Sequence, residues 1–106
     1  MRTSVLLIVL LTGCATTASM NRDLGAKWMG KPVDSFFVKN GPPVNQYPTQ
    51  DGRRVYTWSK RDVAGGIHIY CDLRLVTDAN GILTDIGVSG SSIGAWTTSY
   101  CNEIDW

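Results

Sequence analysis

The chain has 106 residues, with ten Lys and Arg against nine Asp and Glu and a single histidine. That length allows one small domain. The near-neutral balance argues against a nucleic-acid-binding protein, which would show a basic excess or stripe, and against electrostatic attachment to anionic lipid.

The N-terminus carries the parts of a secretory signal: Arg2, an apolar run over residues 5–11, and small residues at a cleavage point. The run is too short to span a membrane, which needs about 20 residues. A buried core helix is the alternative, but the terminal position and all-round apolarity of the run argue against it.

The end of this run, Leu11-Thr12-Gly13-Cys14, resembles the lipobox of bacterial lipoproteins. The resemblance implies that residues 1–13 are a cleaved signal peptide and that Cys14 carries fatty acyl chains such as palmitate. Ala15, rather than aspartate, follows the cysteine. By resemblance to enterobacterial lipoproteins, this implies a lipid anchor in the bacterial outer membrane, with the protein facing the periplasm.

Residues 14–23 are mostly small and polar and predict a lipidated tether, followed by one domain over residues 24–106. Met20, Leu24 and Trp28 recur every four residues and allow a short helix that ends near Gly30.

A second helix is predicted after Pro32, which suits a first helical position. Val33, Phe36 and Phe37 fall on one face of this helix, and Asn40-Gly41 forms its C-terminal stop.

From residue 44 the apolar period changes to two, as in strands. Residues 44–49 are expected as a short edge strand, because Pro48 would break an interior one. Asp51-Gly52 predicts a hairpin turn into a strand over residues 53–60, and residues 62–66 are expected as a flexible connection.

The strongest strand is predicted over residues 67–76, and a return strand over residues 82–88. One face of the first of these carries Ile67, Ile69, Cys71, Leu73 and Leu75, and the other carries His68, Tyr70, Asp72 and Arg74. The return strand places Ile82, Ile86 and Val88 together. The predicted fold is therefore α+β, with two short N-terminal helices packed on a three-stranded antiparallel meander.

The tail from Ser89 is expected as a loop drawn back onto the sheet by Cys101, with Trp96, Tyr100 and Trp106 as packing residues. With Cys14 acylated, Cys71 and Cys101 remain, and two cysteines in a secreted chain predict one disulfide. The alternative is a redox or metal pair, which the absence of a CxxC motif and the single histidine support poorly.

The order of the motifs resembles the small outer-membrane lipoproteins of the SmpA/OmlA, or BamE-like, family over about residues 28–90. The residues that carry the resemblance are Trp28-Met29-Gly30-Lys31-Pro32, Asn40-Gly41-Pro42-Pro43, Asp51-Gly52, Tyr56-Thr57-Trp58, Cys71 and Asn80-Gly81-Ile82. The resemblance implies two small helices on a three-stranded sheet and a supporting role in the assembly of β-barrel outer-membrane proteins. The predicted disulfide and the aromatic C-terminal tail are departures from the family pattern.

The sequence offers few residues in an arrangement that could support catalysis. His68 and Asp72 share a strand face but lie four residues apart, about 13 Å at 3.3 Å per residue, which is too far for a hydrogen bond. We therefore expect His68 to be a solvated surface residue, and we expect no enzyme activity, cofactor, metal site, small-molecule substrate or nucleic-acid partner.

Four residues are candidates for protein binding: Tyr56, Trp58, Tyr70 and Arg74. Tyr, Trp and Arg are the residue types favoured at interface hot spots. If Tyr56 and Trp58 lie on the face opposite the helices, they form an exposed patch with Tyr70 and Arg74. The alternative is that Trp58 belongs to the core and holds the tail.

The expected function is that of an outer-membrane-anchored binding or scaffold module that holds another protein of the cell envelope, in support of β-barrel assembly or envelope integrity. The alternative is a lipid-anchored periplasmic inhibitor of a secreted hydrolase such as a lysozyme, for which a small disulfide-closed domain on a tether is suited.

Overall fold

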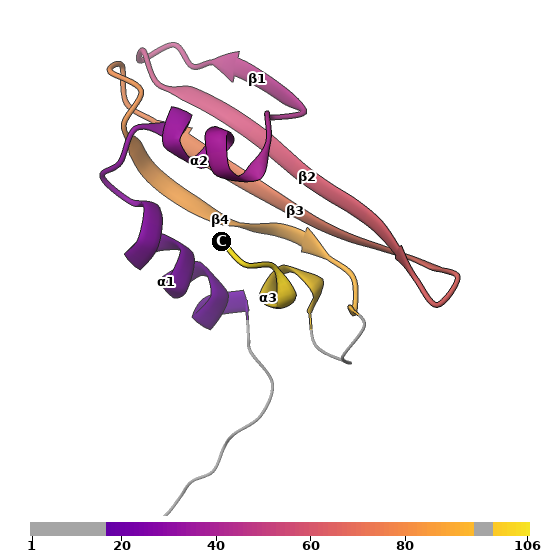
Figure 1. The fold of residues 1–106 in the computed structure, drawn as a ribbon. Helices are drawn as coiled ribbons and strands as arrows, with labels where there is room; N and C mark the ends of the chain where they lie inside the picture. Colours follow the sequence, from indigo (N-terminus) through magenta and orange to yellow (C-terminus); the bar gives the residue numbers. More distant parts are fainter. Residues whose placement is uncertain (1–16, 95–98) are drawn as a thin grey trace, which may run out of the picture.

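The structure is a computed structural model that describes residues 17–94 and 99–106. The elements in chain order are α1 Thr17–Trp28, α2 Val33–Asn40, β1 Asn45–Pro48, β2 Arg54–Ala64, β3 Ile67–Thr77, β4 Leu83–Ser91 and α3 Tyr100–Glu103. The strands form one antiparallel sheet in the order β1-β2-β3-β4. Figure 1 shows the three helices on one side of this sheet. The α+β class is confirmed: in the described residues the expected edge strand β1 joins the three-stranded meander to make four strands, and α3 is one helix more than the sequence predicted.

Helix α1 packs by one apolar stripe. Met20, Leu24 and Trp28 lie four residues apart, so they share a face, and all three are buried. The helix ends just before Gly30, whose φ of +80° is a conformation that suits glycine.

The start of α1 differs from the expected tether over residues 14–23. The helix begins at Thr17 and runs along the outer edge of β4, where the amide N–H of Val88 donates to Oδ1 of Asn21 at 2.8 Å. This contact gives the exposed edge of β4 a partner. Residues 14–16 lie outside the described part of the chain.

Helix α2 follows the predicted boundaries. Pro32 precedes it as the N-cap, and Gly41 closes it with φ +105° while its N–H donates to the carbonyl of Phe37 at 2.8 Å. Val33 and Phe36 are buried, whereas Phe37 is half-buried.

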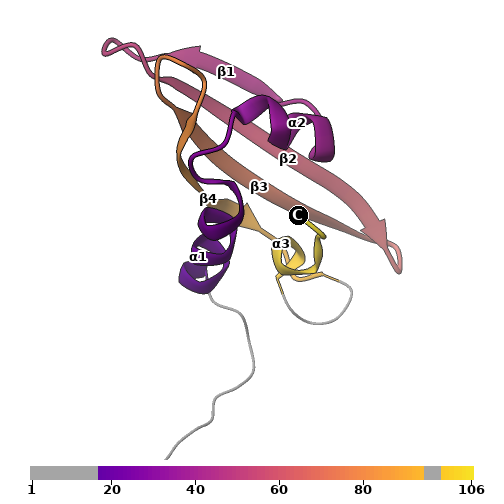
Figure 2. The same cartoon turned by 60° about the vertical axis from the view of Figure 1, so that its left-hand side comes forward.

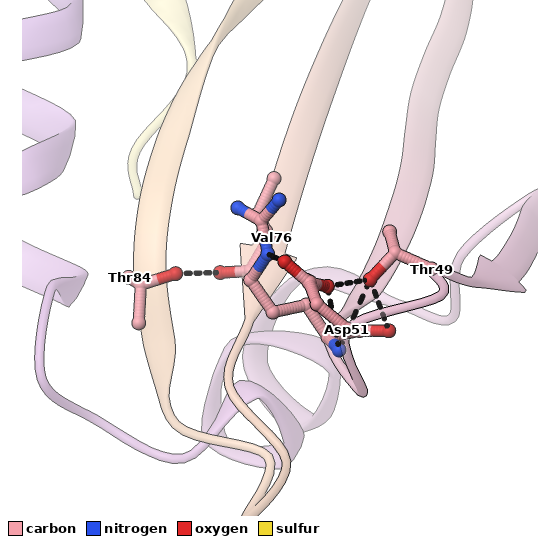
Figure 3. A network of polar contacts seen from close by, with 5 residues as sticks. Thr49, Asp51, Val76 and Thr84 are labelled. Atoms are coloured by element: carbon pink, nitrogen blue, oxygen red, sulfur yellow. Dashed lines mark hydrogen bonds and ion pairs between the residues drawn. The ribbon is translucent and has the colours of Figure 1, made fainter.

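Strand β1 lies at the edge of the sheet, as predicted for a segment that contains Pro48. The Asp51-Gly52 turn that joins it to β2 is confirmed, with Gly52 at φ +87°. The Thr49 hydroxyl donates to the Asp51 carboxylate, and Nε of Arg53 lies 2.9 Å from Oδ2 of Asp51 (Figure 3). The hydrogen bond from Thr49, followed by that from Arg53, lowers the pKa of Asp51 to about 2.

The hairpin between β2 and β3 is longer than the sequence predicted. Residues 62–66 were expected as a flexible connection, but the two strands pair up to Ala64 and Ile67. Gly65 and Gly66 then form the turn, with φ of +58° and +82°. Two positive φ values in succession match the twist of a two-residue hairpin, so the strands stay paired to the end.

The pairing of β3 with β4 contains two register shifts that the sequence did not reveal, one between Asp72 and Leu73 and one between Val76 and Thr77. Between Val76 and Thr77 the pairing slips, and Thr77 faces Leu83. As a result Leu83 is buried, whereas Ile82, expected on the inner face, is half-buried. The hydroxyl of Thr84 donates to the carbonyl of Val76 at 3.3 Å beside this shift (Figure 3).

The predicted disulfide is confirmed. Cys71 in β3 is bonded to Cys101 in α3, with the two Cα atoms 5.0 Å apart and both side chains buried. The bond holds the tail on the helix side of the sheet. The tail was expected as a loop and instead contains the short helix α3, while Trp96 lies outside the described residues.

Two further contacts fix the tail. The ring of Trp106 lies 5.2 Å from that of Trp58, and its Nε1 donates to the carbonyl of Cys101 at 3.0 Å. The hydroxyl of Tyr100 donates to Oδ2 of Asp62 at 3.5 Å. Burial, followed by the charge of Asp62, raises the pKa of Tyr100.

Within the described residues, no helix combines the length and apolarity needed to cross a membrane.

Candidate protein-interaction site

The helices cover one side of the sheet, and we call the other side the open face. Residues paired directly across antiparallel strands point to the same side, and Figures 1 and 2 place all three helices opposite this face. From β2 to β4, the open face carries the buried pair Val55 and Val76 at one end and, beyond it, Thr57, Ser59, Arg61, Val63, His68, Tyr70, Asp72, Arg74 and Asp85.

Arg61 organises the middle of the open face. It pairs with Tyr70 across β2 and β3, and its guanidinium lies 4.8 Å from the centroid of the Tyr70 ring. Its Nη2 is also 3.2 Å from Oδ1 of Asp72. The hydroxyl of Ser59 donates to the same Oδ1 at 2.6 Å. These four side chains form one polar and aromatic cluster from neighbouring strands.

A glycine on β4 makes room for the cluster. Gly90 pairs with Asp72, and a Cβ at this position would lie 3.4 Å from Oδ2 of Asp72 and 3.6 Å from the ring of Tyr70. Those distances are ordinary van der Waals contacts, so a side chain at position 90 would pack directly on the cluster and cover part of it. The glycine therefore keeps the aspartate and the tyrosine ring accessible from the β4 side.

A second ion pair lies further along the same face. Nη1 of Arg74 is 3.5 Å from Oδ2 of Asp85, and both side chains are more than half exposed. An exposed pair of this kind contributes about 0–1 kcal/mol to stability. Arg74 can therefore exchange Asp85 for another carboxylate at little cost to the fold.

The four residues predicted as a protein-binding set lie on two different sides of the sheet. Tyr70 and Arg74 are on the open face, whereas Tyr56 and Trp58 point toward the helices. Trp58 is 3% exposed, and the ring of Tyr56 lies 5.2 Å from that of Phe37. Because Tyr56 and Trp58 face the helices, the four residues do not form a single exposed patch. The contacts of Trp58 match the alternative, in which it belongs to the core and holds the tail.

His68 lies on the open face and is exposed, paired with Val63. Asp72 is engaged by Arg61 and Ser59. In residues 17–94 and 99–106, no group of three or more His, Cys, Asp or Glu side chains could hold a metal ion.

Sequence reasoning missed Arg61 and Ser59. It ended the strand at residue 60, which left Arg61 just beyond the strand and hid its pairing with Tyr70. The signal was available in Gly65-Gly66, because a two-glycine turn allows the strand to continue to residue 64. With that extension, Ser59 and Arg61 alternate onto the same face.

Comparison of the chain with protein-family models, with curated proteins and with solved structures finds no match. The resemblance to the SmpA/OmlA family therefore stays a prediction.

Proposed function

We propose that the chain is a lipid-anchored module of the bacterial outer membrane that binds another protein of the cell envelope through the open face of its sheet. The observation that carries this proposal is the cluster of Arg61, Tyr70 and Asp72, together with the neighbouring Arg74, on the side of the sheet away from the helices. The proposed role is scaffolding and not turnover.

The chemistry of the open face favours contact with protein. Arg and Tyr are enriched at interface hot spots, where a planar guanidinium or a ring fills a desolvated pocket. Arg61 is held over Tyr70 by a cation–π contact, which orders the two side chains before a partner arrives. Ordering in advance lowers the entropy cost of association.

The lipid anchor at Cys14 is the second part of the proposal, and it rests on the motif Leu11-Thr12-Gly13-Cys14. The partner class is an envelope protein, and the resemblance to the SmpA/OmlA family favours a component of the β-barrel assembly machinery. Because the open face presents two arginine–aspartate pairs, Arg61 with Asp72 and Arg74 with Asp85, a partner surface that offers both acidic and basic side chains is the expected complement.

The test is site-specific photo-crosslinking in intact cells, with the full chain. A photoreactive amino acid at Thr57, which is exposed on the open face, should form a discrete protein adduct, whereas the same amino acid at Val38, exposed on α2, should not. Tyr70→Ala and Arg61→Ala should each remove the adduct by weakening binding about tenfold or more. Asp34→Ala, an exposed change on α2, is the matched control and should leave the adduct unchanged.

The identity of the adduct separates the two functions that the sequence left open. A barrel-assembly or other envelope scaffold protein supports the proposal. A lysozyme or another secreted hydrolase, together with inhibition of that hydrolase by the purified chain, supports the inhibitor. Adducts that are the same from positions 57 and 38, or that survive Tyr70→Ala, would contradict both.

A further inference from the structure

The sheet narrows to two strands at one end. The pairing of β3 with β4 begins at Cys71, whereas residues 67–70 of β3 pair with residues 61–64 of β2. The resulting ribbon ends in the Gly65-Gly66 turn. Figures 1 and 2 show it projecting past α2, at the opposite end of the sheet from the turn between β1 and β2.

The end of this ribbon carries an exposed apolar side chain on each side, with exposed His68 opposite Val63 on the open face. Val63 points to the open face, and Ile67 points to the helix side. Ile93, which follows β4, lines a groove with Ala64, Ile67 and Ile69. The side chains of Val63, Ile67 and Ile93 are 55%, 67% and 69% exposed. Clustered exposed apolar side chains mark an interaction surface, because leaving them in water is unfavourable.

The first turn of α1 lies near the same end of the molecule. Thr17 lines a groove together with Ser91 and Ser99. Ser99 forms a β-bridge with Ile93, and Ile93 borders the groove that contains Ile67. A continuous line of neighbouring residues therefore leads from the start of α1 to the apolar end of the ribbon.

We propose that the contact end, defined as Val63, Ile67 and Ile93, lies against the lipid surface that holds the Cys14 anchor. This inference rests on the proposed anchor. Cys14 precedes Thr17 by three residues, which span at most about 11 Å even when fully extended. The start of α1 is therefore held next to the membrane, and the apolar end, which lies beyond α3 at the same end of the molecule, is directed to the same surface.

The charges beside the contact end favour a contact made by apolar burial. Arg61 and Asp62 carry opposite charges at the base of the ribbon. Because these opposite charges largely cancel at the distance of a lipid headgroup layer, electrostatic attraction to anionic lipid contributes little to the contact. The inference predicts that the contact persists at high salt and in vesicles that lack anionic lipid.

The test uses the lipidated full chain in vesicles of phosphatidylethanolamine, with or without phosphatidylglycerol. A photoreactive amino acid is placed at position 67 or 93 and, as the control, at Val38, which is the more exposed at 87%. Only protein that floats with the vesicles is illuminated, and lipid adducts are counted by mass spectrometry. We expect about tenfold or more adducts at 67 and 93 than at 38, because acyl chains are within reach only at a contacting surface.

A second experiment keeps the photoreactive amino acid at one position and changes the apolar side chains around it, so the result does not depend on where the probe is placed. With the photoreactive amino acid at position 63, Ile67→Ser combined with Ile93→Ser should lower the lipid adducts severalfold, whereas Val38→Ser should not. Floating protein with equal adducts at 67 and 38 would overturn the inference and leave the anchor standing. Adducts to a second copy of the chain in place of lipid would also overturn it. Protein that fails to float overturns the anchor and the inference together.

Discussion

At the centre of the core, the ring of Phe36 contacts three indole rings. Its centroid lies 5.1 Å from that of Trp28, 5.7 Å from that of Trp58 and 5.9 Å from that of Trp106. These rings come from α1, α2, β2 and the tail, so one residue joins segments that are far apart in the sequence. Aromatic pairs in such edge or stacked geometries contribute about 0.5–1.5 kcal/mol each beyond the burial of their area.

Trp58 distinguishes a packing residue from a binding residue. Because it is 3% exposed, Trp58→Ala should lower the free energy of unfolding by about 3–5 kcal/mol, measured by urea denaturation. Val38→Ala, at an exposed position, is the control and should change it by less than about 0.5 kcal/mol. A Trp58→Ala protein of nearly normal stability that loses its partner would show instead that the indole is a binding anchor.

Asp51 gives a pH dependence that can be checked at a single carboxyl. The hydrogen bond from Thr49 and the contacts with Arg53 lower its pKa from 3.8 to about 2 in the folded state. The ionised form is therefore favoured by folding, so its stabilising effect is complete above pH 3.8 and is lost as the pH falls through about 2.

The measurement for Asp51 is a carbon-detected NMR titration. Thr49→Val keeps the shape of the side chain but removes the hydroxyl donor, so it should raise the pKa of Asp51 toward 3.8. A titration midpoint near 3.8 in the unsubstituted chain would show that the turn contacts do not form in solution.

At the scale of elements, the sequence predicted α2 and β3 well, because their signals are local. Pro32 and Gly41 delimit α2, and strict alternation from Ile67 to Leu75 defines the two faces of β3. Local residue types carry the information in both cases, through backbone restriction and the period of two.

The features that the sequence did not predict depend on tertiary contacts. The register shift at Val76 has no local signature, so the burial of Leu83 in place of Ile82 could not be read from alternation. The helical start of α1 depends on the packing of Met20 and on the hydrogen bond that Asn21 accepts from the Val88 amide of β4. Helix α3 is one turn long and is held by the disulfide, since so short a helix is not stable alone.

The disulfide between Cys71 and Cys101 joins the sheet to the tail, and it encloses a sequence separation of 30 residues. Reduction should lower the free energy of unfolding by about 2–5 kcal/mol, because the unfolded chain regains the entropy of the open loop. The measurement is urea denaturation with and without reductant. Cys71→Ser combined with Cys101→Ser should start at the lower stability and no longer respond to reductant. Quantitative labelling of both thiols in native, unreduced periplasmic protein would contradict the bond.

At the scale of the whole molecule, the helix layer is shorter than the sheet. The layer buries the inner side of the sheet along most of its length, and it leaves uncovered the open face, apart from the buried pair Val55 and Val76, and the end of the β2–β3 ribbon. The sequence identified Tyr70 and Arg74 of the open face by residue type and alternation. The sequence could not show that Tyr56 and Trp58 lie on the opposite face. Strand β2 carries polar and apolar residues on both sides, so its buried face could be identified only from the positions of the helices.

The proposed anchor would determine where both exposed surfaces are presented, and it can be tested at one atom. Cys14→Ser removes the sulfur that the lipobox resemblance marks for acylation. We expect this variant to lose labelling by radioactive palmitate and to move from the membrane to the soluble fraction. A buried acyl chain contributes about 0.8 kcal/mol per methylene, so even one long chain is worth on the order of 10 kcal/mol.

Ala15→Asp is the matched control for the anchor. It leaves Cys14 in place, so labelling should persist, but the resemblance to enterobacterial lipoproteins implies that aspartate at this position redirects the protein to the inner membrane. Density-gradient separation of the two membranes measures the difference. A Cys14→Ser protein that still sediments with membranes would contradict the lipid anchor.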